Sequence, residues 1–172
     1  MNRKKRSRSN DSFFVGGAVN YSPKKDDPLF DVLNPIVQGL GMSIVELSVS
    51  KQRGTMQIRL TVTKNGVVSV GDCSKVHHAI VPRLELAFPE QELYIEVASP
   101  GIDRTIKDAS EFQLYIGRGV RCYRNDISDW SAGIIEGADD HHLVLRGAKG
   151  TVELSYESIV KAKLDYSQEV ED

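Results

Sequence analysis

The sequence has few cysteines and no long hydrophobic run. Its two cysteines, Cys73 and Cys122, are too few for a disulfide framework. No apolar stretch approaches the roughly 20 residues that a membrane span requires. The N-terminus also lacks the apolar segment of a secretory signal. These absences predict a protein of the reducing cytoplasm that has no membrane partner.

Motifs for catalysis or cofactor binding are also missing. The sequence contains neither G-x-x-x-x-G-K nor G-x-G-x-x-G, and neither C-x-x-C nor H-E-x-x-H. Cys73 and His77 are four residues apart on a predicted helix, a spacing that can place two metal ligands on one face. Cys73 lies in the middle of the apolar face, however, where a small buried thiol is the ordinary interpretation. A hydrolase or metal enzyme built on this pair is the weakest alternative. We predict no enzyme activity, no cofactor, no metal and no small-molecule substrate.

Charge is almost balanced over the chain but unevenly distributed. The formal net charge is -2, so the chain as a whole does not indicate nucleic-acid binding. The last six residues are acidic, whereas the first ten contain the bases Arg3, Lys4, Lys5, Arg6 and Arg8 and no acid. A basic arm can contact RNA phosphates without being part of a fold. A solvated tail with no fixed partner is an equal alternative.

Two helices are predicted in the first half of the chain. Asp27 suits an N-cap and Pro28 suits the first helical position, and apolar residues follow at helical spacing. Ser69 and Asp72 resemble a capping box at the start of a second helix. Pro82 lies inside this second helix, where it is expected to bend or shorten it.

Three strands are predicted with these helices. Residues 43–50 and 56–62 alternate apolar and polar side chains, and the short glycine-containing link between them predicts an antiparallel hairpin. In the first of these strands, Val45 and Leu47 are expected on the same apolar face. A third strand covers residues 92–99. The order helix, strand, strand, helix, strand suits an α/β layer with helices on one face of a small sheet.

The last third of the chain changes character. Short strand-like stretches are separated by Gly, Asp and Asn, with no helix between them, which suggests a small barrel. The predicted fold class is α+β. The predicted limits are a basic disordered tail at 1–27, an N-terminal α/β domain with its connector at 28–116, a C-terminal β-barrel domain at 117–166 and an acidic tail at 167–172.

The connector after the third strand is the most informative stretch. Pro100 and Gly101 suit the central positions of a type II turn, in which Gly101 takes a positive φ. Asp103 can cap this turn, and Arg104 is then free to brace the two domains or to bind a phosphate. Candidate residues for interdomain or partner contacts are Ser99, Pro100, Gly101, Asp103, Arg104, Arg118 and Arg121.

The connector and its flanks also resemble a known family. The string EVASPGIDRTIKDASEFQLYIGRGVRCY is similar to the central signature of the RimP ribosome maturation factors, a strand followed by S-P-G-hydrophobic-D-R, F-x-x-(F/Y)-I-G-R and a second strand. The resemblance extends over residues 28–166. The chain departs from the family pattern in its basic arm, in Pro82, and at His77 and His78, where the family usually has Ser and Arg.

The resemblance implies both a fold and a function. The fold is an N-terminal α/β domain followed by an Sm-like or SH3-like barrel. The function is that of a cytoplasmic, non-catalytic chaperone of 30S subunit assembly, which binds rRNA and ribosomal protein of the immature subunit near the decoding centre. We expect a monomer. The alternative is a generic RNA-binding module of the Sm-like barrel type, against which the balanced charge and the few aromatic residues of the barrel argue.

Overall fold

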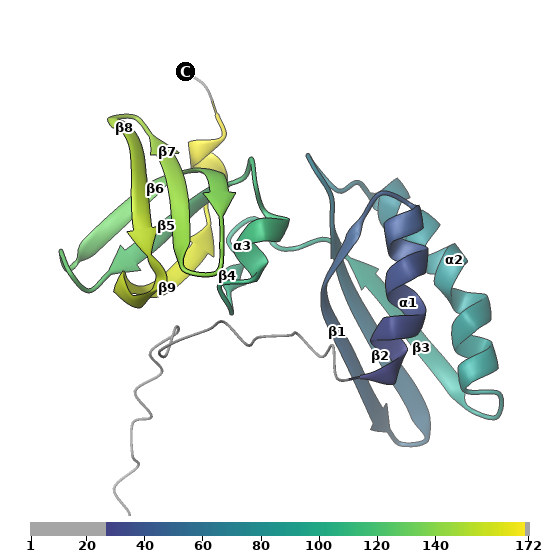
Figure 1. Cartoon of the computed structure of the whole chain (residues 1–172). Coiled ribbons are helices and arrows are strands. Elements are labelled where there is room, and N and C mark those ends of the chain that lie inside the picture. Colours follow the sequence, from purple (N-terminus) through teal and green to yellow (C-terminus); the bar gives the residue numbers. More distant parts are fainter. Residues whose placement is uncertain (1–26, 171–172) are drawn as a thin grey trace, which may run out of the picture.

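The computed structural model describes residues 27–170, which form two sheets that follow one another along the chain (Figure 1). The predicted order of helix, strand, strand, helix and strand is found as α1, β1, β2, α2 and β3. The arm with Arg3, Lys4, Lys5, Arg6 and Arg8 lies outside the described residues, so what we expect of it stays a prediction. None of the helices in the described part of the chain is long and apolar enough to cross a membrane.

The predicted starts of α1 (Pro28–Gly39) and α2 (Val70–Ala87) are confirmed. The carboxylate of Asp27 accepts a hydrogen bond of 2.9 Å from the Leu29 N–H and so caps α1. Ser69 and Asp72 form a complete capping box, in which each side chain accepts a hydrogen bond from the other residue's backbone N–H. These bonds satisfy N–H groups that have no partner within the helix.

Pro82 does not shorten α2, which continues to Ala87. A proline removes the hydrogen bond to the carbonyl one turn earlier, here that of His78. Both Pro82 and His78 are exposed, so water can bind this carbonyl. Of the two effects expected of Pro82, a bend or a shortening of the helix, the shortening does not occur.

The first sheet consists of β1 (Ser43–Gln52), β2 (Thr55–Thr63) and β3 (Glu92–Ala98), with β2 in the centre. The antiparallel hairpin of β1 and β2 is confirmed, and β3 runs parallel to β2. The helices α1 and α2 cover one face of this sheet (Figure 1). Between the sheet and the helices lies a first hydrophobic core, whose fully buried members include Leu33, Val37, Leu47, Ile58, Val76, Ile80 and Leu84.

A β-bulge in β1 changes the predicted face of this strand. The register with β2 skips Val45, which lies between the paired residues Ile44 and Glu46. Ile44 and Leu47 pack in the first core, whereas Val45 is buried in the second core of the protein. The expectation that Val45 and Leu47 share a face was wrong, because the extra residue of a bulge interrupts the alternation of side chains.

The second sheet has six strands in the order β4-β9-β5-β6-β7-β8. All of its neighbouring strands are antiparallel. Its members are β4 (Thr105–Ile106), β5 (Gly119–Arg124), β6 (Asp129–Ala138), β7 (His142–Gly147), β8 (Gly150–Ser155) and β9 (Ile159–Leu164). Strands β5 to β9 fall on the stretches predicted from the sequence. The helices and the largely antiparallel sheets confirm the predicted α+β class. Within residues 27–170, no pairing joins β8 to β4, so a closed barrel is not confirmed.

The connector packs with the second sheet. Its residues 105 and 106 form β4, which pairs with β9, and the short helix α3 (Glu111–Leu114) follows. Phe112 and Tyr115 are buried in the second core, whereas Ile116 is exposed. Residues 105–116 therefore belong to the packing of the second sheet, although the predicted limit at residue 117 groups them with the first. The domain limits themselves stay predictions.

Candidate functional site

The connector does not form the predicted type II turn. Gly101 does not have a positive φ. The turn lies slightly later, where the Arg104 N–H donates to the Gly101 carbonyl at 3.1 Å. A Cβ on Gly101 would meet the Asp103 carboxylate at an ordinary distance of 3.6 Å. The prediction was wrong because Pro-Gly permits a type II turn but does not require one. Here the turn is closed by Arg104, whose own carbonyl accepts a hydrogen bond from the Leu164 N–H at the end of β9.

Arg104 lies at the joint between the two sheets. Its guanidinium donates to Glu46 of β1 at 3.1 Å and to Glu111 of α3 at 3.2 and 3.4 Å. Lys107, just after β4, donates to the other oxygen of Glu46 at 2.8 Å. The Arg104 side chain is only 12% exposed and that of Glu111 only 1%. We call these four residues the joint cluster, and it ties β1 to the segment that pairs with the second sheet.

Burial and ion pairing act in opposite directions on the two carboxylates of the joint cluster. At Glu46, burial works to raise the pKa, but the hydrogen bonds and charges of Lys107 and Arg104 outweigh it and hold the pKa below its ordinary value. At Glu111, burial prevails and raises the pKa in spite of Arg104. Without Arg104, the carboxylate of Glu111 would be buried with no cation beside it.

Apolar packing reinforces the joint. Val45, the bulge residue next to Glu46, is fully buried in the second core together with Ile106, Phe112 and Tyr115. The bulge therefore turns an apolar and an acidic side chain of β1 toward the connector, where one packs against apolar residues and the other binds two cations.

The other predicted connector residues stay at the surface. Ser99, Gly101 and Asp103 are exposed and Pro100 is half-buried. None of the four forms an ion pair within residues 27–170. The structure brings Arg104 together with carboxylates that were not predicted, and it does not gather the whole connector into one site.

Arg118 lies just before β5, and Arg121 lies within this strand. Arg118 donates to Glu169 at 2.8 Å, and the same carboxylate accepts the Gly119 N–H at 2.9 Å. Glu169, predicted within an acidic tail, thus packs against the second sheet. The Arg121 guanidinium lies 5.2 Å from the centre of the Trp130 ring on β6, a cation–π arrangement.

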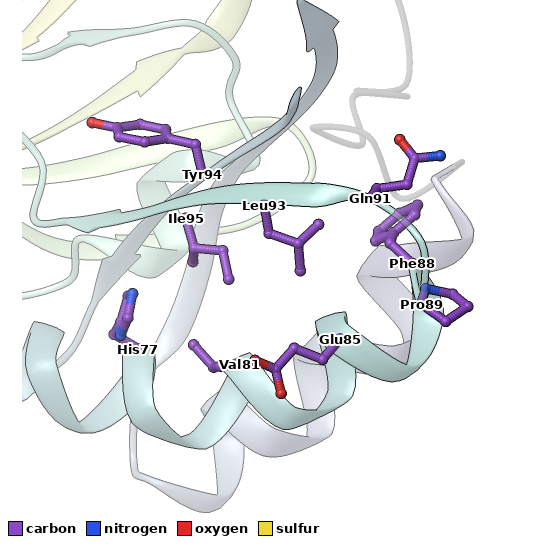
Figure 2. A pocket seen from close by; sticks show the side chains of 9 residues that line it. All are labelled: His77, Val81, Glu85, Phe88, Pro89, Gln91, Leu93, Tyr94 and Ile95. Carbon is purple, nitrogen blue, oxygen red and sulfur yellow. The ribbon is translucent and has the colours of Figure 1, made fainter. Parts of the chain in front are cut away.

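A groove of about 530 Å³ lies between α2 and β3 (Figure 2). Val81 of α2 and Leu93 and Ile95 of β3 line it, and Figure 2 shows His77 and Glu85 on the helix side. Sequence reasoning missed this groove because it depends on how α2 lies over the edge strand.

The pair Cys73 and His77 does not gather further metal ligands. Within the described part of the chain, no group of three or more His, Cys, Asp and Glu side chains is placed to hold a metal ion. Burial raises the pKa of the Cys73 thiol, which disfavours the thiolate that a nucleophile or a metal ligand requires. The local chemistry therefore gives no support to the enzyme alternative.

Three members of the joint cluster were not predicted from the sequence. In the sequence, Glu46 is one of several polar residues on the predicted solvent-exposed face of a strand. Glu111 is an acid at a helix start, and Lys107 resembles an ordinary surface lysine. The one sequence signal for the joint cluster is Arg104, a cation within a motif whose other residues favour a turn. A cation in a buried connector requires a carboxylate partner, but the sequence does not say which one.

The fold and the joint define the class of protein. It is an α+β chain with two sheets, in which buried ion pairs and one bulge residue couple the sheets, and its described residues form no metal-binding cluster.

Comparison with known proteins agrees with this class. The family model described as the RimP N-terminal domain matches residues 32–103. The chain is also similar to the protein named ribosome maturation factor RimP from Borrelia recurrentis (strain A1), with 27% identity over 136 residues, which cover 79% of this chain and 93% of that relative. Residues 32–103 therefore resemble the RimP N-terminal domain, and the longer alignment extends the similarity to most of the chain.

Proposed function

We propose that this protein is a ribosome maturation factor that assists assembly of the small (30S) ribosomal subunit. The observation that carries the proposal is the extent of the match, because 136 aligned residues are too many to fall within the part of the chain that forms either sheet alone. The relative is named a ribosome maturation factor, and the alignment covers 93% of its length. The shared region therefore includes residues from both sheets.

The finer features of the proposal follow the same resemblance. The protein acts in the cytoplasm as a monomeric, non-catalytic factor, and it binds rRNA and ribosomal protein of the immature subunit near the decoding centre. Strands β5 to β8 form consecutive antiparallel pairs and β9 returns to the side of β5, an order that is consistent with a small Sm-like or SH3-like barrel. Such a unit would present its outer face to the subunit.

Gradient co-sedimentation tests the proposal. The purified full chain is mixed with immature small subunits, with mature small subunits and with complete ribosomes. We expect binding to free small subunits, strongest to the immature form, and none to complete ribosomes. Equal occupancy of all three particles would contradict an assembly role and indicate a general ribosome-binding protein.

A generic RNA-binding module is the second candidate function. The stacked pair of Arg121 and Trp130 on the second sheet favours it, because exposed aromatic and basic side chains are typical of RNA-binding surfaces. Competition with protein-free rRNA separates the two functions. An assembly factor is displaced from immature subunits only weakly by free rRNA, whereas a generic module is displaced at equal nucleotide concentration.

A further inference from the structure

Basic and aromatic side chains gather on the outer face of β9, β5 and β6. Strand pairing sets Lys161, Tyr123 and Trp130 side by side in one row, and Lys163 and Arg121 side by side in the next row. Residues two apart on a strand point to the same face, so the two rows are adjacent on one surface. We call these five residues the aromatic–basic patch.

Trp130 is the centre of the aromatic–basic patch. Trp130 is 41% exposed. The Tyr123 ring meets it edge-to-face with centres 5.4 Å apart, and the Arg121 guanidinium lies 5.2 Å from its centre. Two neighbours thus hold the indole in place while part of it faces solvent. A flat apolar surface held in this way loses little side-chain entropy when a ligand stacks on it.

The cations of the patch are free to bind an anion. Within residues 27–170, Arg121, Lys161 and Lys163 take part in no ion pair, whereas Arg104, Arg118, Arg124 and Arg146 all do. Of the two aspartates close to Trp130 in the sequence, Asp126 is paired with Arg124, and Asp129 accepts the backbone N–H of Trp130 at 2.7 Å. Among the described residues, three unpaired cations therefore stand against the single unpaired charge of Asp129 here. The balanced charge of the chain therefore conceals a local excess of positive charge.

We propose that the aromatic–basic patch binds an unpaired stretch of RNA. A base stacks on Trp130, and Arg121, Lys161 and Lys163 contact the phosphates on either side. Aromatic platforms beside cations are how proteins hold single strands, since every base offers a flat face and every nucleotide a charge. An acidic protein surface would satisfy the cations but leave the exposed indole without a stacking partner. The proposal deepens the proposed function and rests on it for the source of the RNA.

Tryptophan fluorescence tests the stacking directly. Trp130 is the single tryptophan of the chain, so the emission reports on the patch alone. The full chain is titrated with a uridylate 12-mer and with an abasic ribose-phosphate chain of the same length. We expect the uridylate to quench the emission and the abasic chain to leave it almost unchanged, because only a base can stack on the indole.

Variants separate stacking from charge, with binding followed by the anisotropy of a labelled uridylate 12-mer. Trp130→Ala is expected to weaken binding at least about fivefold, the lower end for loss of one base stack. The triple variant Arg121→Gln, Lys161→Gln, Lys163→Gln removes up to three phosphate contacts. It is expected to reduce the slope of log affinity against log salt by up to about 2, at about 0.7 per contact.

Matched controls lie on the first sheet and on α2. Tyr94→Ala removes an aromatic residue that is 50% exposed, on the edge strand β3. Lys51→Gln, Arg53→Gln, Lys75→Gln removes the same charge from exposed positions outside any ion pair of the described residues. Both controls are expected to keep the affinity within about twofold, apart from the general effect of net charge. Circular dichroism confirms that each variant is folded.

Two results would overturn the assignment. One is RNA binding without quenching of Trp130, or with equal losses in patch and control variants, which would place the RNA elsewhere on the chain. The other is a patch variant that keeps its RNA affinity but no longer co-sediments with small subunits, which would make the patch a protein-docking surface within an intact assembly role. Failure of the unaltered protein to bind small subunits would count against the proposed function and not against the patch.

Discussion

Arg104 contacts residues of both sheets, and these contacts bear on the two roles that the sequence left open for it. A side chain that contacts phosphate in a partner has to reach solvent, but Arg104 is 12% exposed and its guanidinium is occupied by Glu46 and Glu111. These contacts favour a brace between the sheets. A buried arginine that serves two carboxylates is costly to remove, because the carboxylates stay behind.

Replacement of Arg104 by alanine is expected to lower the free energy of unfolding by about 3 kcal/mol, as for the loss of one partner of a buried ion pair. Arg59→Ala is the control, since Arg59 pairs with Glu96 at 3.3 Å but both side chains are well exposed. Its expected cost is at most about 1 kcal/mol. Urea unfolding measures both. A cost for Arg104→Ala that is no larger than the control would show that the buried pair adds nothing.

Gly133 is a second residue whose identity is fixed by its surroundings. A Cβ at this position would lie 2.6 Å from the carbonyl oxygen of Arg146 on β7, closer than van der Waals contact permits. Gly133→Ala is expected to destabilise the second sheet by about 1–3 kcal/mol through this overlap. Gly137→Ala, on the same strand, is the control because its nearest contact is 3.9 Å. Thermal unfolding followed at 222 nm compares the two, and equal melting temperatures would contradict the argument.

At the scale of elements, α2 shows what local sequence can specify. Its start is encoded by the reciprocal bonds of Ser69 and Asp72, which need no partner from elsewhere in the chain. Ser69→Ala is expected to cost about 1 kcal/mol of stability, as is typical for loss of an N-cap side chain. Ser74→Ala, an exposed position inside the same helix, should be neutral or slightly stabilising. Chemical unfolding that ranks the two variants in the opposite order would contradict this account of the cap.

The elements that sequence reasoning predicted have local causes, and those that it missed depend on distant partners. The alternation of apolar residues predicted the hairpin and the strands of the second sheet, and capping chemistry predicted both long helices. The bulge at Val45 could not be predicted, because its side chain follows the second core and not the strand's own pattern. β4 has two residues and exists only through its pairing with β9, so it leaves almost no local signal.

The same distinction applies to the candidate sites. The connector was identified because its signature is dense in turn-forming and charged residues, but its turn is displaced and only Arg104 among its predicted residues enters the joint cluster. The sequence predicted only part of the aromatic–basic patch. Arg121 was predicted as a site residue, and its proximity to Trp130, Lys161 and Lys163 follows from the register of three strands that the sequence alone does not set.

At the scale of the whole molecule, a small set of contacts couples the two sheets. They are the packing of Val45 into the second core and the ion pairs of Glu46 with Arg104 and Lys107. We expect the partner in the function proposed above to contact both sheets. Their coupling therefore determines how the second sheet is presented when the first is bound, and a change in the coupling would alter affinity without any change at the contact surface itself.

This coupling is expected to weaken in acid, because it depends on the ionised form of Glu46. The pKa of Glu46 is held below its usual value of 4.5 in the folded protein, so the stabilisation by its ion pairs is complete above that value and is lost as the pH falls through the lowered pKa. The raised pKa of Glu111 has the opposite effect on stability in acid, since protonation of Glu111 relieves part of the cost of its burial. Arg104 and Lys107 stay charged throughout this range.

Nitrogen-15 relaxation, recorded separately for amides of the two sheets, measures the coupling. At neutral pH the two sheets should give the same rotational correlation time. As the pH falls through the lowered pKa of Glu46, the two values should separate while the dispersion of the spectrum shows that both sheets stay folded. Glu46→Gln should show the separation already at neutral pH and little further change in acid. Glu96→Gln, on the same sheet but paired with Arg59 away from the joint cluster, should behave as the unaltered protein. If Glu46→Gln and Glu96→Gln gave the same relaxation at neutral pH, the ion pairs of Glu46 would not hold the sheets together, and the packing of Val45 would remain as the coupling between them.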